Sequence, residues 1–113
     1  MTAGRVVAFV PDLMDRSKVA AVLGDRGRFA SSPMALVEAA ADADLAVIDL
    51  DRLVATGGDD VLDAVAEVAA RAGRVIGFAS HVERERLEEA RALGCDQVLA
   101  RSAFFSQLAT LLV

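Results

Sequence analysis

The stretch at residues 44–51, which reads DLAVIDLD, constrains the fold of this chain more than any other. Its apolar run at 45–48 has acids on both sides, a pattern typical of a short strand buried on both faces of a parallel sheet. Such a strand ends at Asp49, and open parallel sheets place their functional sites at the carboxyl ends of the strands. The stretch therefore predicts a central strand and a candidate site residue.

Further apolar runs alternate with segments that have the period of amphipathic helices. In addition to the strand at 45–49, this pattern predicts strands at residues 5–10, 28–30, 74–79 and 97–100 and helices at 13–23, 32–42, 60–72, 82–93 and after 102. The connections between them are a few residues long. Strands and helices that alternate in this way indicate a parallel sheet with helices on both faces. We expect a single α/β domain over residues 1–113, with the flavodoxin-like strand order 2-1-3-4-5 in a doubly wound, three-layer α/β/α arrangement.

Capping residues predict where several helices begin and end. Asp12 or Asp15 is the expected N-cap of the first helix, with Gly24 at its end. Ser32 followed by Pro33 begins the second helix. Ser102 is the expected cap of the last helix.

Two expectations concern side-chain faces and a connection. The second helix is expected to turn Met34, Val37 and Ala41 toward the core. The segment that follows Asp49, which contains Thr56, Gly57 and Gly58, reads as a loop with a flexible turn.

Composition excludes several classes of function. The formal net charge of −5 argues against a basic face for nucleic acid or an anionic membrane. No apolar stretch reaches the roughly 18 residues of a membrane helix, and no signal-peptide pattern is present. The lone Cys95 allows no internal disulfide and fits a cytoplasmic location. Phosphate loops, nucleophile elbows and zinc-ligand clusters are also missing, so we do not expect an enzyme.

Three segments of the sequence resemble the receiver domains of bacterial two-component response regulators. They are residues 6–19 (VVAFVPDLMDRSKV), 42–50 (DADLAVIDL) and 75–105 (VIGFASHVERERLEEARALGCDQVLARSAFF). In that family an Asp at the end of strand three accepts a phosphoryl group from a histidine kinase, and two acids after strand one hold Mg²⁺. The resemblance implies that Asp49 is the phosphoacceptor.

The remaining positions of the family pattern are changed in this chain. Asp12 matches the second acid, but Pro11 stands at the first, so Mg²⁺ would be left with Asp12 and Asp49 as its acidic ligands. Receivers also have a Ser or Thr at the end of strand four. Here Ala79 stands at that position, with Ser80 one residue later. Arg101 replaces the Lys at the end of strand five and keeps a positive charge in a planar group.

Other changes fall outside the reacting groups. Ser102 replaces the Pro that usually follows the Lys, Val98 replaces the aromatic residue of strand five, and the Pro-containing loop after the phosphoacceptor is missing. The resemblance is therefore to an atypical receiver, or pseudo-receiver. A direct pair between Arg101 and Asp49 would imitate a permanently occupied site.

Several residues have both a functional and an ordinary reading. Asp51 is a spare acid near the same edge, and Ser80 and His81 face the site or simply begin the next helix. Cys95 is expected to be buried rather than nucleophilic. Of Phe104 and Phe105, one is expected to pack inward; the other, if exposed beside Leu112 and Val113, would form a docking patch where a homodimer could assemble.

Two classes of function follow from these observations. The first is a stand-alone signalling module that binds a protein partner, such as a histidine kinase or an effector, with phosphorylation of Asp49 as a conditional part. Its signal would be read on the face made by residues 82–93, 97–100 and the last helix. The second is a phosphorylation-independent scaffold or oligomerisation protein of the same fold. A small flavodoxin-like ligand binder or enzyme is a third reading, which needs an apolar pocket at the strand ends.

Overall fold

The computed structural model describes residues 4–57, 61–80 and 84–112 and contains one five-stranded parallel sheet. The strands are β1 (Val6–Phe9), β2 (Gly27–Phe29), β3 (Leu45–Asp49), β4 (Arg74–Ala79) and β5 (Gln97–Ala100). Their order in the sheet is β2-β1-β3-β4-β5, so the predicted flavodoxin-like order is confirmed.

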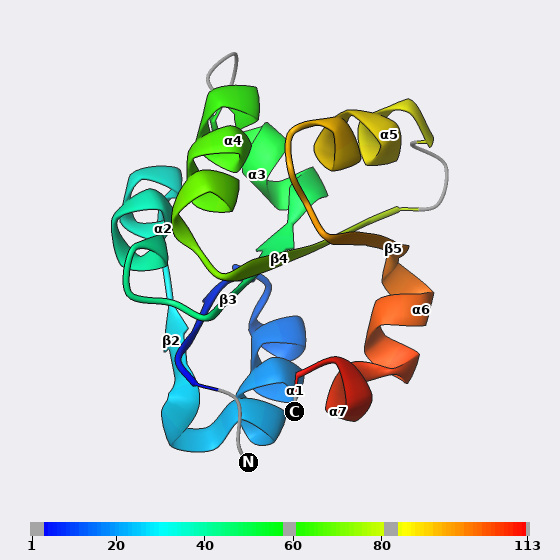
Figure 1. Cartoon of the computed structure of the whole chain (residues 1–113). Coiled ribbons are helices and arrows are strands. Elements are labelled where there is room, and N and C mark those ends of the chain that lie inside the picture. Colours follow the sequence, from blue (N-terminus) through cyan, green and yellow to red (C-terminus); the bar gives the residue numbers. More distant parts are fainter. Residues whose placement is uncertain (1–3, 58–60, 81–83, 113) are drawn as a thin grey trace.

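Helices cover both faces of the sheet (Figure 1). One face carries α1 (Leu13–Leu23), α6 (Arg101–Ser106) and α7 (Leu108–Leu111), and the other carries α2 (Pro33–Ala40), α3 (Leu50–Gly57), α4 (Val61–Arg71) and α5 (Arg84–Ala92). A short 3₁₀ turn, Gly24–Arg26, leads into β2. No helix in the described part of the chain has the length and apolar character needed to cross a membrane.

The central strand β3 is buried along its whole length because it has a neighbour on each side and helices on both faces. Alternate side chains enter opposite cores: Ala46 and Ile48 pack beneath α2, α3 and α4, whereas Leu45 and Val47 pack beneath α1, α6 and α7. The parallel register aligns Phe9 with Ile48 and Asp49 with Phe78. Asp49 thus reaches the carboxyl edge of the sheet between β1 and β4.

Local chemistry explains the helix ends that the sequence predicts. The side chain of Asp12 accepts hydrogen bonds from the backbone of Met14 and Asp15, so Asp12 is the N-cap of α1. Gly24 ends α1 with a φ of 56°, a conformation that favours glycine. Ser32 caps α2 through the backbone N–H of Ala35, 3.1 Å away.

Three expectations about the elements are wrong. The predicted loop after Asp49 is largely the helix α3, whose Leu50 and Leu53 are buried against the sheet. The expected inward face of α2 is wrong at two of its three residues: Met34 is 72% exposed and Ala41 is exposed, whereas Val37 packs against the core beside Leu36 and Ala40. The last helix begins at Arg101 without a side-chain cap and is interrupted before α7, so Ser102 does not cap it.

Candidate functional site

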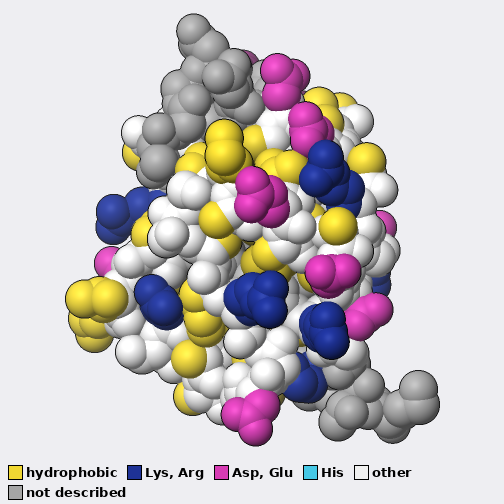
Figure 2. All heavy atoms as spheres, turned by 90° about the vertical axis from the view of Figure 1, so that its left-hand side faces the viewer, with side chains coloured by type: hydrophobic (Ala, Val, Ile, Leu, Met, Phe, Trp, Pro, Cys, Tyr) yellow, Lys and Arg dark blue, Asp and Glu magenta, His cyan; other side chains and the backbone are white. Residues whose placement is uncertain are grey.

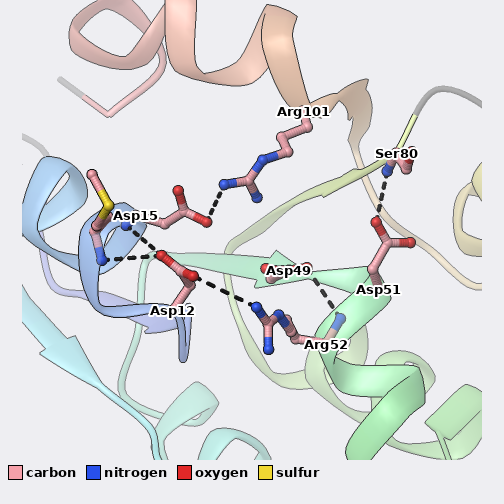
Figure 3. A network of polar contacts seen from close by, with 8 residues as sticks. Asp12, Asp15, Asp49, Asp51, Arg52, Ser80 and Arg101 are labelled. Carbon is pink, nitrogen blue, oxygen red and sulfur yellow. Dashed lines mark hydrogen bonds and ion pairs between the residues drawn. The ribbon is translucent and has the colours of Figure 1, made fainter.

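Four carboxylates, those of Asp12, Asp15, Asp49 and Asp51, lie at the carboxyl edge of the sheet (Figure 3). Asp12 stands between β1 and α1, Asp15 lies in the first turn of α1, and Asp49 ends β3. Asp15 and Asp49 are the buried charged residues of the described chain, at 3% and 2% exposure. Burial of a carboxylate is costly unless charged or hydrogen-bonding partners compensate for lost water, so the partners of each acid show what it does.

Asp49 acts as the N-cap of α3. Its Oδ1 accepts a hydrogen bond, 3.1 Å long, from the backbone N–H of Arg52, which is three residues later in the sequence. This contact explains why the helix begins directly after the strand. Burial raises the pKa of Asp49, while the N–H of Arg52 and the charge of Arg101 oppose that rise.

Asp15 is the direct partner of Arg101. The Nη2 of Arg101 both donates a hydrogen bond to and forms an ion pair with Oδ2 of Asp15, across 86 residues of sequence. The Asp15 carboxylate raises the pKa of Arg101. The predicted direct pair between Arg101 and Asp49 is therefore wrong, because the nearer carboxylate on α1 takes the guanidinium.

Aromatic rings hold the same guanidinium from another side. The Cζ of Arg101 lies 5.1 Å from the ring centre of Phe105 and 6.0 Å from that of Phe78. Phe78 in turn stacks on Phe104, with ring centres 4.3 Å apart. Arg101 is thus fixed by a buried carboxylate and by a packed aromatic cluster.

Asp12 and Arg52 form the second contact between an acid and an arginine. Oδ1 of Asp12 accepts the backbone N–H of Met14 at 3.0 Å and that of Asp15 at 3.1 Å. Oδ2 lies 3.5 Å from Nη2 of Arg52. The N–H of Asp15 is the main cause of a lowered pKa of Asp12, and the charge of Arg52 contributes. Figure 3 shows the Arg52 side chain reaching from the start of α3 toward Asp12, below Asp49.

Asp51 and Ser80 connect α3 to the end of β4. The backbone N–H of Ser80 donates to Oδ2 of Asp51, at 2.7 Å. Ser80 therefore takes part through its backbone, and Asp51 fastens the first turn of α3 to the neighbouring strand.

Each of the acids at this edge has a partner within the chain. Asp12 accepts two backbone amides and faces Arg52, Asp49 caps α3, and Asp15 pairs with Arg101. Within the described residues, no group of three His, Cys, Asp or Glu side chains is arranged to hold a metal ion. In this arrangement two arginines lie beside the acids and supply positive charge there.

The other sequence candidates have different outcomes. Burial raises the pKa of Cys95 to about 11, in agreement with an unreactive thiol. Phe105 is half-buried in the aromatic cluster and Leu112 is fully buried, so these two residues do not form the exposed patch that the sequence allowed. Val113, the third residue of that patch, lies outside the described residues. His81 lies outside the described residues.

Arg52 and Asp15 are the site residues that the sequence reasoning missed. From the sequence, Asp15 is a candidate helix cap; its place in the first turn of α1 directs it to the same edge as Asp12. The partner of Asp15 comes from 86 residues away. A sequence signal for Arg52 exists: Leu50 and Leu53 have the spacing of one helix face, which indicates a helix directly after the strand. Arg52 lies in the first turn of that helix, at the same edge of the sheet as Asp12.

Comparison with known proteins gives structural matches only. No protein-family model and no curated protein matches the sequence. A response regulator from Burkholderia pseudomallei, solved with a phosphorylated aspartic acid, calcium ion and citrate, superposes with a TM-score of 0.75 at 17% identity over 97% of this chain and 66% of its own.

Two shorter solved chains match over almost their whole length. A response regulator from Hahella chejuensis has a TM-score of 0.74 at 18% identity and covers 97% of this chain and 92% of its own. The signal receiver domain of the NarL regulator from Mycobacterium tuberculosis has a TM-score of 0.73 at 20% identity, with coverage of 98% and 94%. This chain therefore has the receiver fold of response regulators, in an atypical form whose site carboxylates contact arginines.

Proposed function

We propose that this chain is a pseudo-receiver, which binds a protein partner in one fixed conformation without phosphorylation of Asp49. The observation that carries the proposal is the ion pair between Arg101 and the 3%-exposed Asp15. By position, Arg101 corresponds to the family Lys, which contributes a cation to the site. Here that cation is already neutralised by a buried acid, so a phosphoryl group on Asp49 would have to compete with Asp15 for it.

The surroundings of Asp49 support the same function. Phosphoryl transfer needs a carboxylate oxygen that a donor can approach in line, and a metal ion to neutralise the transferring charge. Asp49 is 2% exposed and its Oδ1 caps α3. Asp12, the other acid at the expected metal position, contacts Arg52. The family resemblance predicts the opposite, with Asp49 as phosphoacceptor and with Asp12 and Asp49 as Mg²⁺ ligands. Incubation with a phosphoryl donor and Mg²⁺ decides between the two.

The position of the two cavities found among the described residues supports an interaction role over an enzyme. Two surface cavities, of about 290 and 320 Å³, lie along β2 and α2 rather than at the carboxyl edge of the sheet. Neither is the apolar pocket at the strand ends that the ligand-binding reading needs. A cytoplasmic location and a protein partner are part of this proposal.

The test is the intact mass of the protein after incubation with acetyl phosphate and Mg²⁺. The matched control is Asp49→Asn, which keeps an oxygen that can cap α3. We expect no phosphoryl adduct on the wild-type chain. An adduct on the wild type that Asp49→Asn abolishes would overturn the proposal and make the chain a working receiver.

A further inference from the structure

Arg52 contacts both Asp12 and Asp49, through different parts of the residue. It lies in the first turn of α3, where its backbone N–H donates to Oδ1 of Asp49 over 3.1 Å. Its side chain turns back across the carboxyl edge of the sheet, and Nη2 lies 3.5 Å from Oδ2 of Asp12. Figure 3 shows the guanidinium beside Asp12 and below Asp49. A positive group therefore stands at the two acids that the receiver resemblance connects with Mg²⁺.

The acids at this edge outnumber the arginines that contact them. Arg101 contacts Asp15 and Arg52 contacts Asp12 within the described residues, which leaves two further carboxylates beside them. On the side of β2 and α2, by contrast, acidic and basic side chains are interspersed (Figure 2). The excess of negative charge is thus a feature of the carboxyl edge, and such an excess favours a cation there.

The second carboxylate oxygen of Asp49 is open to a ligand. Asp49 is 2% exposed, and its Oδ1 accepts the N–H of Arg52. No group in the parts of the chain that the structure describes donates to Oδ2, although every fully buried side-chain oxygen there has a partner. Oδ2 of Asp49 therefore reaches the surface, at the same edge as Oδ2 of Asp12. Carboxylate oxygens of this kind are the ligands that divalent ions such as Mg²⁺ and Mn²⁺ take.

A guanidinium on the chain has an advantage over an ion in solution. Because the Arg52 side chain is tethered to α3, its effective concentration at Asp12 is on the order of millimolar or higher. Pro11 stands where the receiver pattern has its first acid, so a divalent ion would have one carboxylate fewer to bind. The ion and the guanidinium need the same Oδ2 of Asp12, and their charges repel. Binding of the ion therefore requires Arg52 to leave.

We propose that Arg52 is a built-in competitor of a divalent cation at Asp12 and Asp49, so that its guanidinium lowers the affinity of this edge for the ion. The inference rests on the proposed function, which it deepens by naming a residue that regulates access of a metal ion to Asp49. The two can fail separately. A phosphoryl adduct on the wild-type chain would refute the pseudo-receiver, whereas the metal affinity of Arg52 variants is measured without a phosphoryl donor.

The test compares the affinity of the full chain for Mn²⁺ in the wild type and in Arg52→Ala, measured from the electron paramagnetic resonance signal of the free ion. The substitution removes the guanidinium but keeps the backbone N–H that donates to Asp49, and alanine favours the helix. We expect Arg52→Ala to bind Mn²⁺ about tenfold more tightly. Arg74→Ala removes the same charge from the exposed start of β4, at the opposite edge of the sheet, and should leave the affinity unchanged.

Asp12→Asn in the Arg52→Ala background locates the ion. The gained affinity should be lost there, because asparagine offers the ion a neutral oxygen while it still caps α1. Circular dichroism checks the fold, and Arg52→Gln is the second variant if Arg52→Ala perturbs it. Equal affinities of the wild type and Arg52→Ala, or no binding by Arg52→Ala at millimolar Mn²⁺, would overturn the proposal. Equal gains in Arg52→Ala and Arg74→Ala, or a gain that survives Asp12→Asn, would overturn it as well.

Discussion

The guanidinium of Arg101 contacts a carboxylate and an aromatic ring at the same time. Asp15 accepts its hydrogen bond, and the ring of Phe105 lies against it with the ring centre 5.1 Å from Cζ. Because Asp15 is buried, its charge depends on this one partner far more than the half-exposed arginine depends on the acid. Loss of the ion pair therefore costs more free energy at the buried Asp15 than at the partly exposed Arg101.

Arg101→Met should destabilise the fold, because it leaves the Asp15 charge buried without its partner. We expect a loss of about 2 kcal/mol in the free energy of unfolding, a figure reduced from that of a fully buried pair because Arg101 is partly exposed. Urea denaturation measures it. Asp15→Asn and the double variant complete a double-mutant cycle. The interaction energy between the two positions should be about 1 kcal/mol or more. Additive losses would show that the ion pair has no energetic role.

Asp49→Asn should stabilise the protein at neutral pH by about 1 kcal/mol, because it removes a buried charge and keeps the oxygen that caps α3. A raised pKa means that the folded state binds the proton more tightly than the unfolded state. The destabilisation by the ionised wild-type carboxylate therefore grows as the pH rises from the ordinary value of 3.8 through the raised value.

Urea unfolding at pH 7 and near pH 3 checks this dependence, since the advantage of Asp49→Asn should vanish at the lower pH. Asp49→Ala is the control for the cap and should be about 1 kcal/mol less stable than Asp49→Asn. A wild type more stable than Asp49→Asn at pH 7 would mean that the charge of Asp49 is itself favourable.

At the scale of elements, the sequence predicts what local chemistry determines. The strands end within about two residues of their predicted limits, because apolar runs and breakers act over a few positions. Asp12, Gly24 and the Ser32–Pro33 pair mark helix ends for the same reason. α3 was missed because two glycines favoured a turn, while its cap, Asp49, belongs to the strand before it. The partner of Arg101 lies on a distant element, and no local pattern specifies it.

Substitutions at Asp12 test whether the residue serves the helix or a metal ion. Asp12→Ala removes both the N-cap of α1 and the contact with Arg52, whereas Asp12→Asn keeps the cap. We expect Asp12→Ala to be clearly less stable than Asp12→Asn in thermal unfolding. Because the pKa of Asp12 is lowered, its ionised form stabilises the fold above pH 3.8, and this contribution is lost as the pH falls through the lowered value.

The melting temperature in the presence of Mg²⁺ shows whether this prediction for Asp12 is wrong. If Asp12 is a cap paired with Arg52, Mg²⁺ should not raise the melting temperature of the wild type. A rise that Asp12→Asn abolishes would identify Asp12 as a metal ligand.

At the scale of the molecule, a receiver needs a route by which the site moves a distant surface. In this chain Val98 on β5 is buried and has no ring to rotate, while Phe78, Phe104 and Phe105 form a packed cluster beside Arg101. The carboxyl edge is joined to α1 by Asp15 and to α3 by Asp49. These contacts support the single conformation that we propose for this chain.

Restoring the family residues at two positions should restore phosphorylation, if their loss is what prevents it. Pro11→Asp supplies the first acid at an exposed position, and Arg101→Lys replaces the planar guanidinium with a compact ammonium. In acetyl phosphate and Mg²⁺, the double variant should gain the mass of one phosphoryl group, and Asp49→Asn in the same background should not. Circular dichroism checks that the variants fold. If the folded double variant gains no adduct, the loss of the family acid at position 11 and of the family lysine at position 101 is not the cause, and burial of Asp49 beneath its own helix is what closes the site.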